Sequence, residues 1–258
     1  MSQYPPIINI LSKSVRNIGK SIVRDYSEIE KLQNSLKPQL NFVQRTNSKI
    51  NANLSSALTK LKKESSILDL NSKHNSNCWI LESIDSVKNF ARGIPSFCSV
   101  VGSIEKDILN SCVIYSPVSD DLCVFHRGSG GYHNGLRMRV SEIKQFNASL
   151  LGIFREYEGE NESKFMELIR KKLYKKSVSF RESGSLFIDV CNVGYGKLDC
   201  CLSVNIPLNS HKLCSLIIQE TGGISHYIKK GDKHISIFSN KSIGNFIKEM
   251  IEDSNEKK

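Results

Sequence analysis

No run of apolar residues in the sequence approaches the roughly 20 that a membrane-spanning helix requires. The N-terminal stretch, Met1–Pro6, lacks the basic segment and the apolar block that mark a secretion signal. There are only one tryptophan and six prolines, and no two cysteines form a C-x-x-C pair. These absences argue against a membrane-spanning, secreted or zinc-ribbon protein. We therefore expect a cytoplasmic protein that has no membrane partner.

Eight cysteines are present, and most of them lie inside apolar runs. Cys123-x-x-His126 and His211-x-x-Cys214 have the spacing of metal ligands, but neither belongs to a four-ligand zinc pattern. The six histidines show no grouping typical of a metal cluster or a catalytic base. We expect the cysteines to be buried free thiols that behave as small apolar residues.

Positive charge exceeds negative charge, since 36 Lys and Arg against 26 Asp and Glu give a net charge of +10. Such a balance favours acidic partners or nucleic acid. Lysine, however, is abundant throughout the chain, and we find no aromatic interleaving of the kind that single-strand binders use. Short basic stretches such as 170–172 and 229–230 are therefore predicted to be solvated faces.

Helical and strand patterns alternate along the chain. Apolar residues spaced by three and four predict helices over 7–26, 47–62, 162–174, 184–194, 210–221 and 243–252. Short apolar runs predict strands near 66–68, 79–81, 97–104, 111–115, 122–126, 198–204, 224–228 and 235–238. Ser119–Asp121 indicates a hairpin turn, and Gly222-Gly223 indicates a helix stop. Helices interleaved with strands predict a layered α/β domain.

Residues 79–95 resemble the signature of the inositol monophosphatase family. They begin W-I-L-E-S-I-D-S-V-K-N-F, against W-I-x-D-P-I-D-G-T-x-N-F in the family. Further elements resemble the family in the same order: Y-S-P at 115–117, R-G-S-G at 127–130, N-G-L-R at 134–137, R-E-S-G-S at 181–185 and L-I-I-Q-E-T-G-G at 216–223. The order holds from about residue 7 to residue 250, and the bacterial SuhB-type branch is the most similar.

The resemblance implies a fold and an activity. The implied fold is a layered αβαβα sandwich, α/β in class, in a single domain over 1–258. Its first half, roughly 1–145, carries the remnant signature, and 146–258 forms the second half. The resemblance also implies a homodimer and Mg²⁺-dependent hydrolysis of inositol monophosphate or a related small phosphate ester. In that chemistry two or three Mg²⁺ clamp the phosphate and one activates a water, so several carboxylates must converge.

The signature segment keeps only part of such a site. By the resemblance, Glu82 replaces the first signature Asp and Asp85 retains the second. Ser86 replaces a Gly, and Val87 replaces the Thr that orients the nucleophilic water, so no catalytic residue is assigned. The backbone amides of Ser86 and Val87 remain where the family binds phosphate.

Other family positions have lost their acids. By the resemblance, Asn41 and Asn47 occupy the two acidic positions of D-x-V-T-x-x-D. Ser210 occupies the Asp position of a W-D motif, and Ser203 occupies that of a Glu which contacts the substrate. We expect Asn47 and Ser210 to cap helices instead.

The family's E-E pair has two alternative counterparts, which the sequence leaves open. One alignment places Asp69-Leu70 there, and a different gap places Lys63-Glu64. Neither restores both acids. The remaining candidate metal ligands are Glu82, Asp85 and Asp69, which suffice for one weakly held Mg²⁺ but not for a two-metal clamp.

Three hypotheses follow from this pattern. The first is a catalytically inactive family member that acts through a protein or ribonucleoprotein partner. The second is a residual Mg²⁺-dependent phosphatase that uses Glu82, Asp85 and Asp69. The third is a phosphate or sugar sensor that uses the amides near 86–89 without catalysis. Loss of acids beside retained turns and core segments favours the first.

Overall fold

The computed structural model describes residues 5–31, 36–62, 65–73, 76–155, 167, 169–176, 179–231 and 233–252. The chain divides into two compact units, Met1–Arg137 (unit 1) and Met138–Lys258 (unit 2). Along the described residues, no helix combines the length and the apolar character that crossing a membrane requires.

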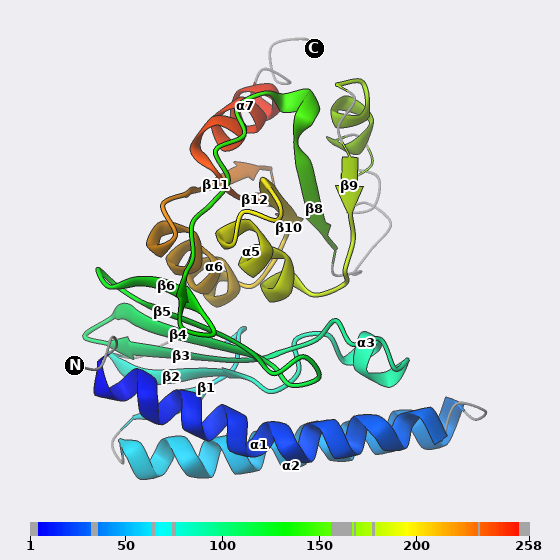
Figure 1. Cartoon of the computed structure of the whole chain (residues 1–258), viewed down its shortest axis with the longest axis vertical. Helices are drawn as coiled ribbons and strands as arrows, with labels where there is room; N and C mark the ends of the chain where they lie inside the picture. The colour runs from blue at the N-terminus through cyan, green and yellow to red at the C-terminus, as the bar shows by residue number, and fades with distance from the viewer. Residues whose placement is uncertain are drawn as a thin grey trace. The chain divides into compact units, whose positions relative to one another are not determined.

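In unit 1, two long helices lie side by side along one face of a seven-stranded sheet (Figure 1). The helices are α1 (Pro6–Lys31) and α2 (Leu36–Leu61). The strands are β1 (Ser66–Leu68), β2 (Asn77–Glu82), β3 (Ser99–Glu105), β4 (Ile108–Ser116), β5 (Asp121–His126), β6 (Gly130–His133) and β7 (Leu136–Arg137). They lie in chain order; β1 and β2 are parallel, and the other neighbours are antiparallel. The short helix α3 (Val87–Ala91) separates β2 from β3.

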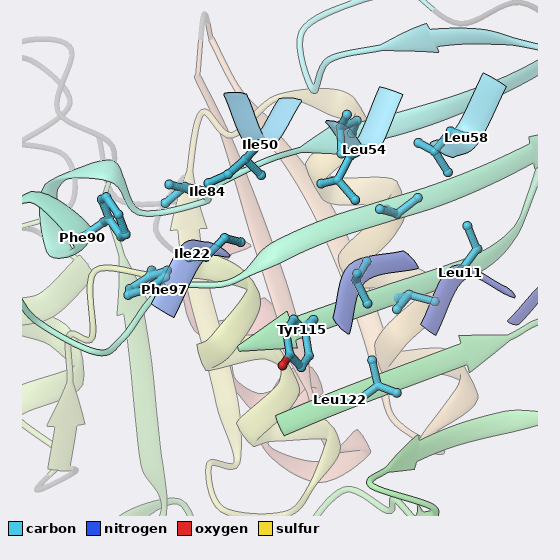
Figure 2. Close-up of a cluster of buried hydrophobic side chains, with 14 of the residues drawn as sticks. Leu11, Ile22, Ile50, Leu54, Leu58, Ile84, Phe90, Phe97, Tyr115 and Leu122 are labelled. Atoms are coloured by element: carbon cyan, nitrogen blue, oxygen red, sulfur yellow. The ribbon is translucent and has the colours of Figure 1, made fainter. Parts of the chain in front are cut away.

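The core of unit 1 lies between these helices and the sheet (Figure 2). Leu11 and Ile22 of α1 and Leu54 of α2 are fully buried there. Trp79 and Leu81 of β2 belong to the same cluster, as expected where alternate strand residues point to one face. The apolar spacing that predicted the two helices thus marks the sides that cover the sheet.

An aromatic cluster attaches the signature segment to this core. Phe90 of α3 packs edge-on against Phe97, with ring centroids 5.0 Å apart. Tyr26 of α1 lies 6.0 Å from the first ring and 5.4 Å from the second, and its hydroxyl donates to the carbonyl of Gly93. The segment that carries Glu82 and Asp85 is therefore held at both its strand and its helix.

Unit 2 contains a five-stranded mixed sheet in the order β11-β12-β10-β8-β9 (Figure 1). Its strands are β8 (Leu150–Phe154), β9 (Ser179–Arg181), β10 (Cys200–Val204), β11 (Ile224–Lys230) and β12 (Lys233–Ser239). Its helical elements are the 3-10 turn η1 (Phe146–Ala148) and the helices α5 (Leu186–Gly194), α6 (Leu208–Glu220) and α7 (Lys241–Glu252). β8 is parallel to both of its neighbours, and β12 is antiparallel to both of its own.

Helices cover both faces of the second sheet. Ile243 and Ile247 of α7 share a buried cluster with Leu202 of β10 and other alternate strand residues. Cys201 and Ser203 of β10 point to the opposite face, because side chains alternate along a strand. That face is covered by α5 and α6.

Helix α6 ends in a complete Schellman motif, which confirms the predicted helix stop. Gly222 has a φ of +88°. Its amide donates to the Gln219 carbonyl over 3.1 Å, and the amide of Gly223 donates to the Ile218 carbonyl over 2.9 Å. These are the two bonds that define the motif.

Two predicted helix starts were wrong. Helix α2 begins at Leu36, so Asn47 lies in its interior and cannot cap it. The buried positions Val43 and Ile50 show the apolar spacing running back past Asn47. Helix α6 begins at Leu208 after Pro207, which places Ser210 inside the first turn.

The other expectations were met to different degrees. The helix predicted over 184–194 begins at Leu186, with Ser185 as the N-cap that accepts from the Ile188 amide over 3.2 Å. Of the helix predicted over 162–174, residues 169–174 are helical, and most of its first part lies outside the described residues. The hairpin at Ser119–Asp121 is confirmed between β4 and β5. Strands β6, β7, β8 and β9 and helix α3 were not predicted.

All eight cysteines are buried and free, as predicted. Burial raises the pKa of the Cys200 thiol to about 12 and also raises that of Cys201. Thiols with such pKa values remain protonated at neutral pH and act as small apolar groups.

Candidate functional site

Asp85 is hydrogen-bonded into the fold of the signature segment. Its carboxylate accepts from the Cys98 amide over 2.8 Å, and its own amide donates to the Cys98 carbonyl over 3.0 Å. Nearby, the Ser99 hydroxyl donates to the Ser83 carbonyl over 2.6 Å. The end of β2 and the start of β3 are thus fastened across the segment that carries the family signature.

Substitution of Asp85 separates a structural from a metal-binding role. We expect Asp85→Ala to lower the free energy of unfolding by about 1–2 kcal/mol, because the Cys98 amide loses its acceptor. Asp85→Asn keeps an amide oxygen at that place, so its loss should stay below about 1 kcal/mol. Urea unfolding of both variants, with and without 10 mM Mg²⁺, measures the difference. A structural role requires the same ranking in both buffers; stabilisation by Mg²⁺ that Asp85→Asn abolishes would contradict it.

Asp69 and Glu82 lie at the same edge of the sheet. Leu68 pairs with Ile80 in the parallel β1–β2 ladder. Asp69, the residue after β1, and Glu82, the last residue of β2, therefore lie at neighbouring strand ends. Asp69 is exposed and accepts from the Ser72 hydroxyl, the Ser72 amide and the Asn71 amide over 2.7, 2.8 and 2.9 Å. The Ser72 hydroxyl is the main cause of the lowered pKa of Asp69. Glu82, the last residue of β2, is half-buried.

The predicted phosphate-binding positions lie at the start of α3. Ser86 is buried and is the N-cap residue, but its side chain makes no capping hydrogen bond. Val87 begins the helix and is exposed. The first amides of any helix lack intrahelical acceptors, which makes this turn the place where an anion could be received. Val87 brings no hydroxyl to it.

The two asparagines at predicted acidic positions both belong to α2. Asn41 is exposed. Asn47 is half-buried, and its Oδ1 is buried without a hydrogen-bond partner among the described residues. Of the alternative E-E counterparts, Asp69-Leu70 follows β1, whereas Lys63-Glu64 lies outside the described residues.

The remaining predicted positions belong to unit 2. Ser203 is fully buried in β10, and its hydroxyl has no hydrogen-bond partner in the described part of the chain. Ser210 is buried in the first turn of α6, beside the equally buried Asn209. Neither hydroxyl carries a negative charge, whereas Mg²⁺ sites in proteins are built around carboxylates.

His211, which follows Ser210, is embedded among polar and aromatic side chains. Its Nδ1 lies 2.9 Å from the Ser236 hydroxyl and its Nε2 lies 3.3 Å from the Ser215 hydroxyl. The rings of Tyr227 and Phe238 pack against it, with centroids 4.9 and 5.4 Å away. Burial, followed by the charge of His234, lowers the pKa of His211 from 6.5 to about 4.

This histidine predicts a loss of stability in mild acid. Its folded pKa of about 4 lies below the unfolded value of 6.5, so the unfolded chain binds the proton first. Stability from the neutral ring is complete above pH 6.5 and falls as the pH drops toward 4. After allowance for solvent screening we expect a loss on the order of 1–2 kcal/mol. Urea unfolding at pH 7, 6, 5 and 4 measures it.

His211→Asn is the matching variant for the pH series. Its unfolding free energy should be lower at pH 7 but should change less between pH 6.5 and 4. The pKa of His226 is also lowered by burial, so a smaller dependence of the same sign should remain. Parallel pH curves for the variant and the original chain would contradict the assignment to His211.

Asp199 is a buried carboxylate that the sequence analysis missed. It precedes β10 and accepts from the Leu150 amide over 2.7 Å and from the Ser141 hydroxyl. Asn240 joins the group by donating to the Ser141 hydroxyl over 2.9 Å. The available signal was an acid placed directly between apolar residues of a predicted strand. Its bonds are to the protein's own donors, which indicates a structural role.

The described donor set does not fit a cluster of metal ions. No three side chains of the His, Cys, Asp and Glu types converge anywhere in the described ranges. In unit 1 the predicted positions contribute Asp69, Glu82 and Asp85, of which two are hydrogen-bonded within their own loops. Mg²⁺ keeps its water shell unless several oxygen ligands are brought together. We therefore derive no catalytic step through a metal.

Comparison with known proteins identifies the family. The model of the inositol monophosphatase family matches residues 3–246, so the chain belongs to that family. A Nus factor SuhB from Buchnera aphidicola is 29% identical over 224 residues, covering 84% of each chain. An inositol-1-monophosphatase from Rhizobium meliloti is 25% identical over 256 residues, covering 95% of this chain and 96% of that protein.

Solved structures share the fold. SuhB from Bartonella henselae gives a TM-score of 0.80 at 20% identity, over 96% of this chain and all of that one. SuhB from Mycobacterium tuberculosis gives 0.81 at 17% identity, over 96% of both chains. The predicted fold class, an α/β sandwich of the inositol monophosphatase type, is confirmed.

Proposed function

We propose that this chain is an inositol monophosphatase-family protein that has lost metal-dependent hydrolysis and acts by binding a macromolecular partner. One observation carries the proposal: the retained acid Asp85 is held by the Cys98 amide, and Asp69 is held within its own turn. Both carboxylates thus serve the local fold. At the remaining positions that the resemblance assigns to acids, the sequence has amides and hydroxyls.

The chemistry of phosphate ester hydrolysis supports the same conclusion. A two-metal clamp depends on negative oxygens that outweigh the hydration of Mg²⁺. Loss of a single group that stabilises the transition state costs roughly 3–4 kcal/mol, or a factor of 10² to 10³ in rate. Asn41, Asn47, Val87 and Ser210 represent several such losses, so the residual rate should be close to that of the uncatalysed reaction.

The relatives support a binding function without requiring an active site. Several carry the name Nus factor SuhB, and another carries that of an inositol-1-monophosphatase. Both names occur within one family, so membership alone does not imply hydrolysis. We propose a protein or ribonucleoprotein partner, a homodimer and a cytoplasmic location for this chain.

A hydrolysis assay tests the proposal. The purified chain with 10 mM Mg²⁺ or Mn²⁺ and inositol monophosphate should release phosphate no faster than a protein-free blank. The Rhizobium meliloti relative serves as the positive control for the reagents. Turnover in the usual enzymatic range of about 1–10³ s⁻¹ that is abolished by Asp85→Asn would sink the idea.

A second candidate, a residual phosphatase, is favoured by one observation. The parallel β1–β2 register brings Asp69 and Glu82 to the same sheet edge, near the segment that carries Asp85. Two of these carboxylates would suffice to hold one Mg²⁺ weakly, with water completing its coordination. Isothermal titration with Mg²⁺ and Mn²⁺ addresses this; binding at millimolar metal that Glu82→Gln removes would support it, and absence of heat would exclude it.

A further inference from the structure

Two basic stretches that are far apart in the sequence lie together in unit 2. Ile169 and Leu173, from the helix that contains the first stretch, share a buried cluster with Ile228 at the end of β11 and Ile251 of α7. The lysines beside these apolar residues therefore border one surface. We call it the lysine patch; it consists of Lys171, Lys172, Lys175, Lys176, Lys230 and Lys233.

The proximity of the two stretches has an electrostatic signature. Burial, and then the positive charge of Lys172, lower the pKa of Lys230. Lys230 and Lys233 also face each other across the β11–β12 hairpin. Positive groups from the helix and from the hairpin thus act on one another, although more than 50 residues separate them along the chain.

Much of this positive charge is not neutralised locally. Lys171, Lys175 and Lys176 are exposed, and no acidic side chain lies within ion-pair distance of them in the described part of the chain. The acid Glu182 is instead paired with two arginines, Arg155 and Arg170, over 3.1 and 2.9 Å.

The spacing of these lysines along the helix is unfavourable for an isolated chain. Lys171 and Lys175 are four residues apart, as are Lys172 and Lys176, and like charges at this spacing destabilise a helix by a few tenths of a kcal/mol. A bound polyanion would relieve this repulsion.

An exposed aromatic ring lies within the patch. Tyr174, between the lysines of the helix, keeps 55% of its surface exposed. Its ring packs edge-on against Phe180, with centroids 4.8 Å apart, and the Arg170 guanidinium lies 5.8 Å from its centroid. The ring is therefore supported on one side and available on another. The sequence analysis found no aromatic residue within the short basic stretches, yet the Tyr174 ring is exposed between Lys171 and Lys175.

We propose that the lysine patch binds the backbone of a single-stranded nucleic acid and that Tyr174 stacks on one of its bases. Cations that follow a phosphate backbone, combined with an aromatic face for the bases, are the common features of single-strand binding surfaces. A purely acidic protein partner would match the lysines but would leave the exposed tyrosine without a role. This inference deepens the proposed binding function and rests on it, because it names the partner class.

Two triple variants with equal charge loss test the patch. K171Q/K175Q/K176Q removes three exposed lysines of the patch, and K13Q/K20Q/K60Q removes three exposed lysines of α1 and α2. Binding of labelled, unstructured RNA and DNA oligonucleotides is followed by fluorescence anisotropy between 50 and 200 mM salt in the presence of EDTA. The patch variant should bind about ten-fold more weakly, and its slope of log K against log salt should shrink by about 2. The α1–α2 variant should stay within about two-fold of the original chain.

Tyr174 provides the second arm of the experiment. Tyr174→Ala should weaken single-strand binding by about ten-fold and duplex binding much less, whereas Tyr174→Phe should retain the affinity. Comparison of RNA with DNA of the same sequence identifies which nucleic acid is preferred. Thermal melting confirms that all variants are folded.

Three results would overturn the inference. They are no binding by the original chain at 50 mM salt, equal losses in the two triple variants, and binding of polyglutamate as tight as that of RNA with no effect of Tyr174→Ala. The last would point to an acidic protein partner. Hydrolysis and oligonucleotide binding are measured in separate assays. Failure to bind oligonucleotides would overturn the lysine patch but not the proposed loss of catalysis. Observed hydrolysis would overturn the loss of catalysis but not the binding result.

Discussion

Asp199→Ala should lower the free energy of unfolding by about 3–4 kcal/mol. The Asp199 side chain is buried, and its carboxylate accepts from the Leu150 amide and the Ser141 hydroxyl. Alanine leaves both donors without acceptors in a place that solvent does not reach. Hydrogen bonds to charged groups contribute about 1.5–3 kcal/mol each, and stranded donors add their desolvation cost. Urea unfolding followed by far-ultraviolet circular dichroism measures the loss.

Two further variants define the cause of this effect. Asp199→Asn keeps one acceptor oxygen but turns an NH₂ group toward a donor, so its loss should be smaller, about 2 kcal/mol. Glu249→Gln removes a charge from the exposed side of α7 and should change stability by less than about 0.5 kcal/mol. If the alanine variant at Asp199 matched this surface control, the network would have no structural importance.

Gly223→Ala should be the second most damaging change, with a loss of about 3 kcal/mol. An added Cβ at Gly223 would lie 2.4 Å from the Ser239 carbonyl oxygen and 2.7 Å from Cγ2 of Ile218. The carbonyl belongs to the backbone of β12, so it cannot rotate away as a flexible side chain could. Chemical denaturation, with the midpoint and the slope both recorded, measures the loss.

The neighbouring glycine is the matched control. At Gly222 an added Cβ meets nothing within 4 Å, but the residue has a φ of +88°. Gly222→Ala therefore suffers only the conformational penalty of the left-handed region, about 1 kcal/mol. If the two variants lost equal stability, backbone strain rather than the close approach of β12 would govern this corner.

Elements with strong local signals could be predicted from the sequence. The apolar spacing of α1 and α7 and the double glycine after α6 are patterns of residues that lie close together in the sequence. Each of them therefore predicts its element without knowledge of the rest of the fold. Starts of helices were harder. At α6 the serine expected to cap, Ser210, is the third residue of the helix, since Pro207 already fixes the backbone at the entry. β8 was missed because its short apolar run, Leu150–Phe154, shows no alternation and is interrupted by Gly152.

The candidate site was predictable in its residue types but not in its bonds. Resemblance identified Asp85 as a surviving acid, but its acceptor role depends on Cys98, which lies 13 residues further along the chain. Asp199 depends on Leu150, 49 residues before it. Such pairings are set by sheet topology, and no local pattern records them. The same holds for the lysine patch, whose two halves appeared in the sequence as unrelated solvated faces.

The eight buried thiols can report how often the structure around each of them opens. Four belong to each unit, and none forms a disulfide. An alkylating reagent can reach such a group only while the structure around it is transiently open, and it reacts with the thiolate that then forms. Mass spectrometry of the labelled peptides would therefore give a separate opening rate for each half of the chain.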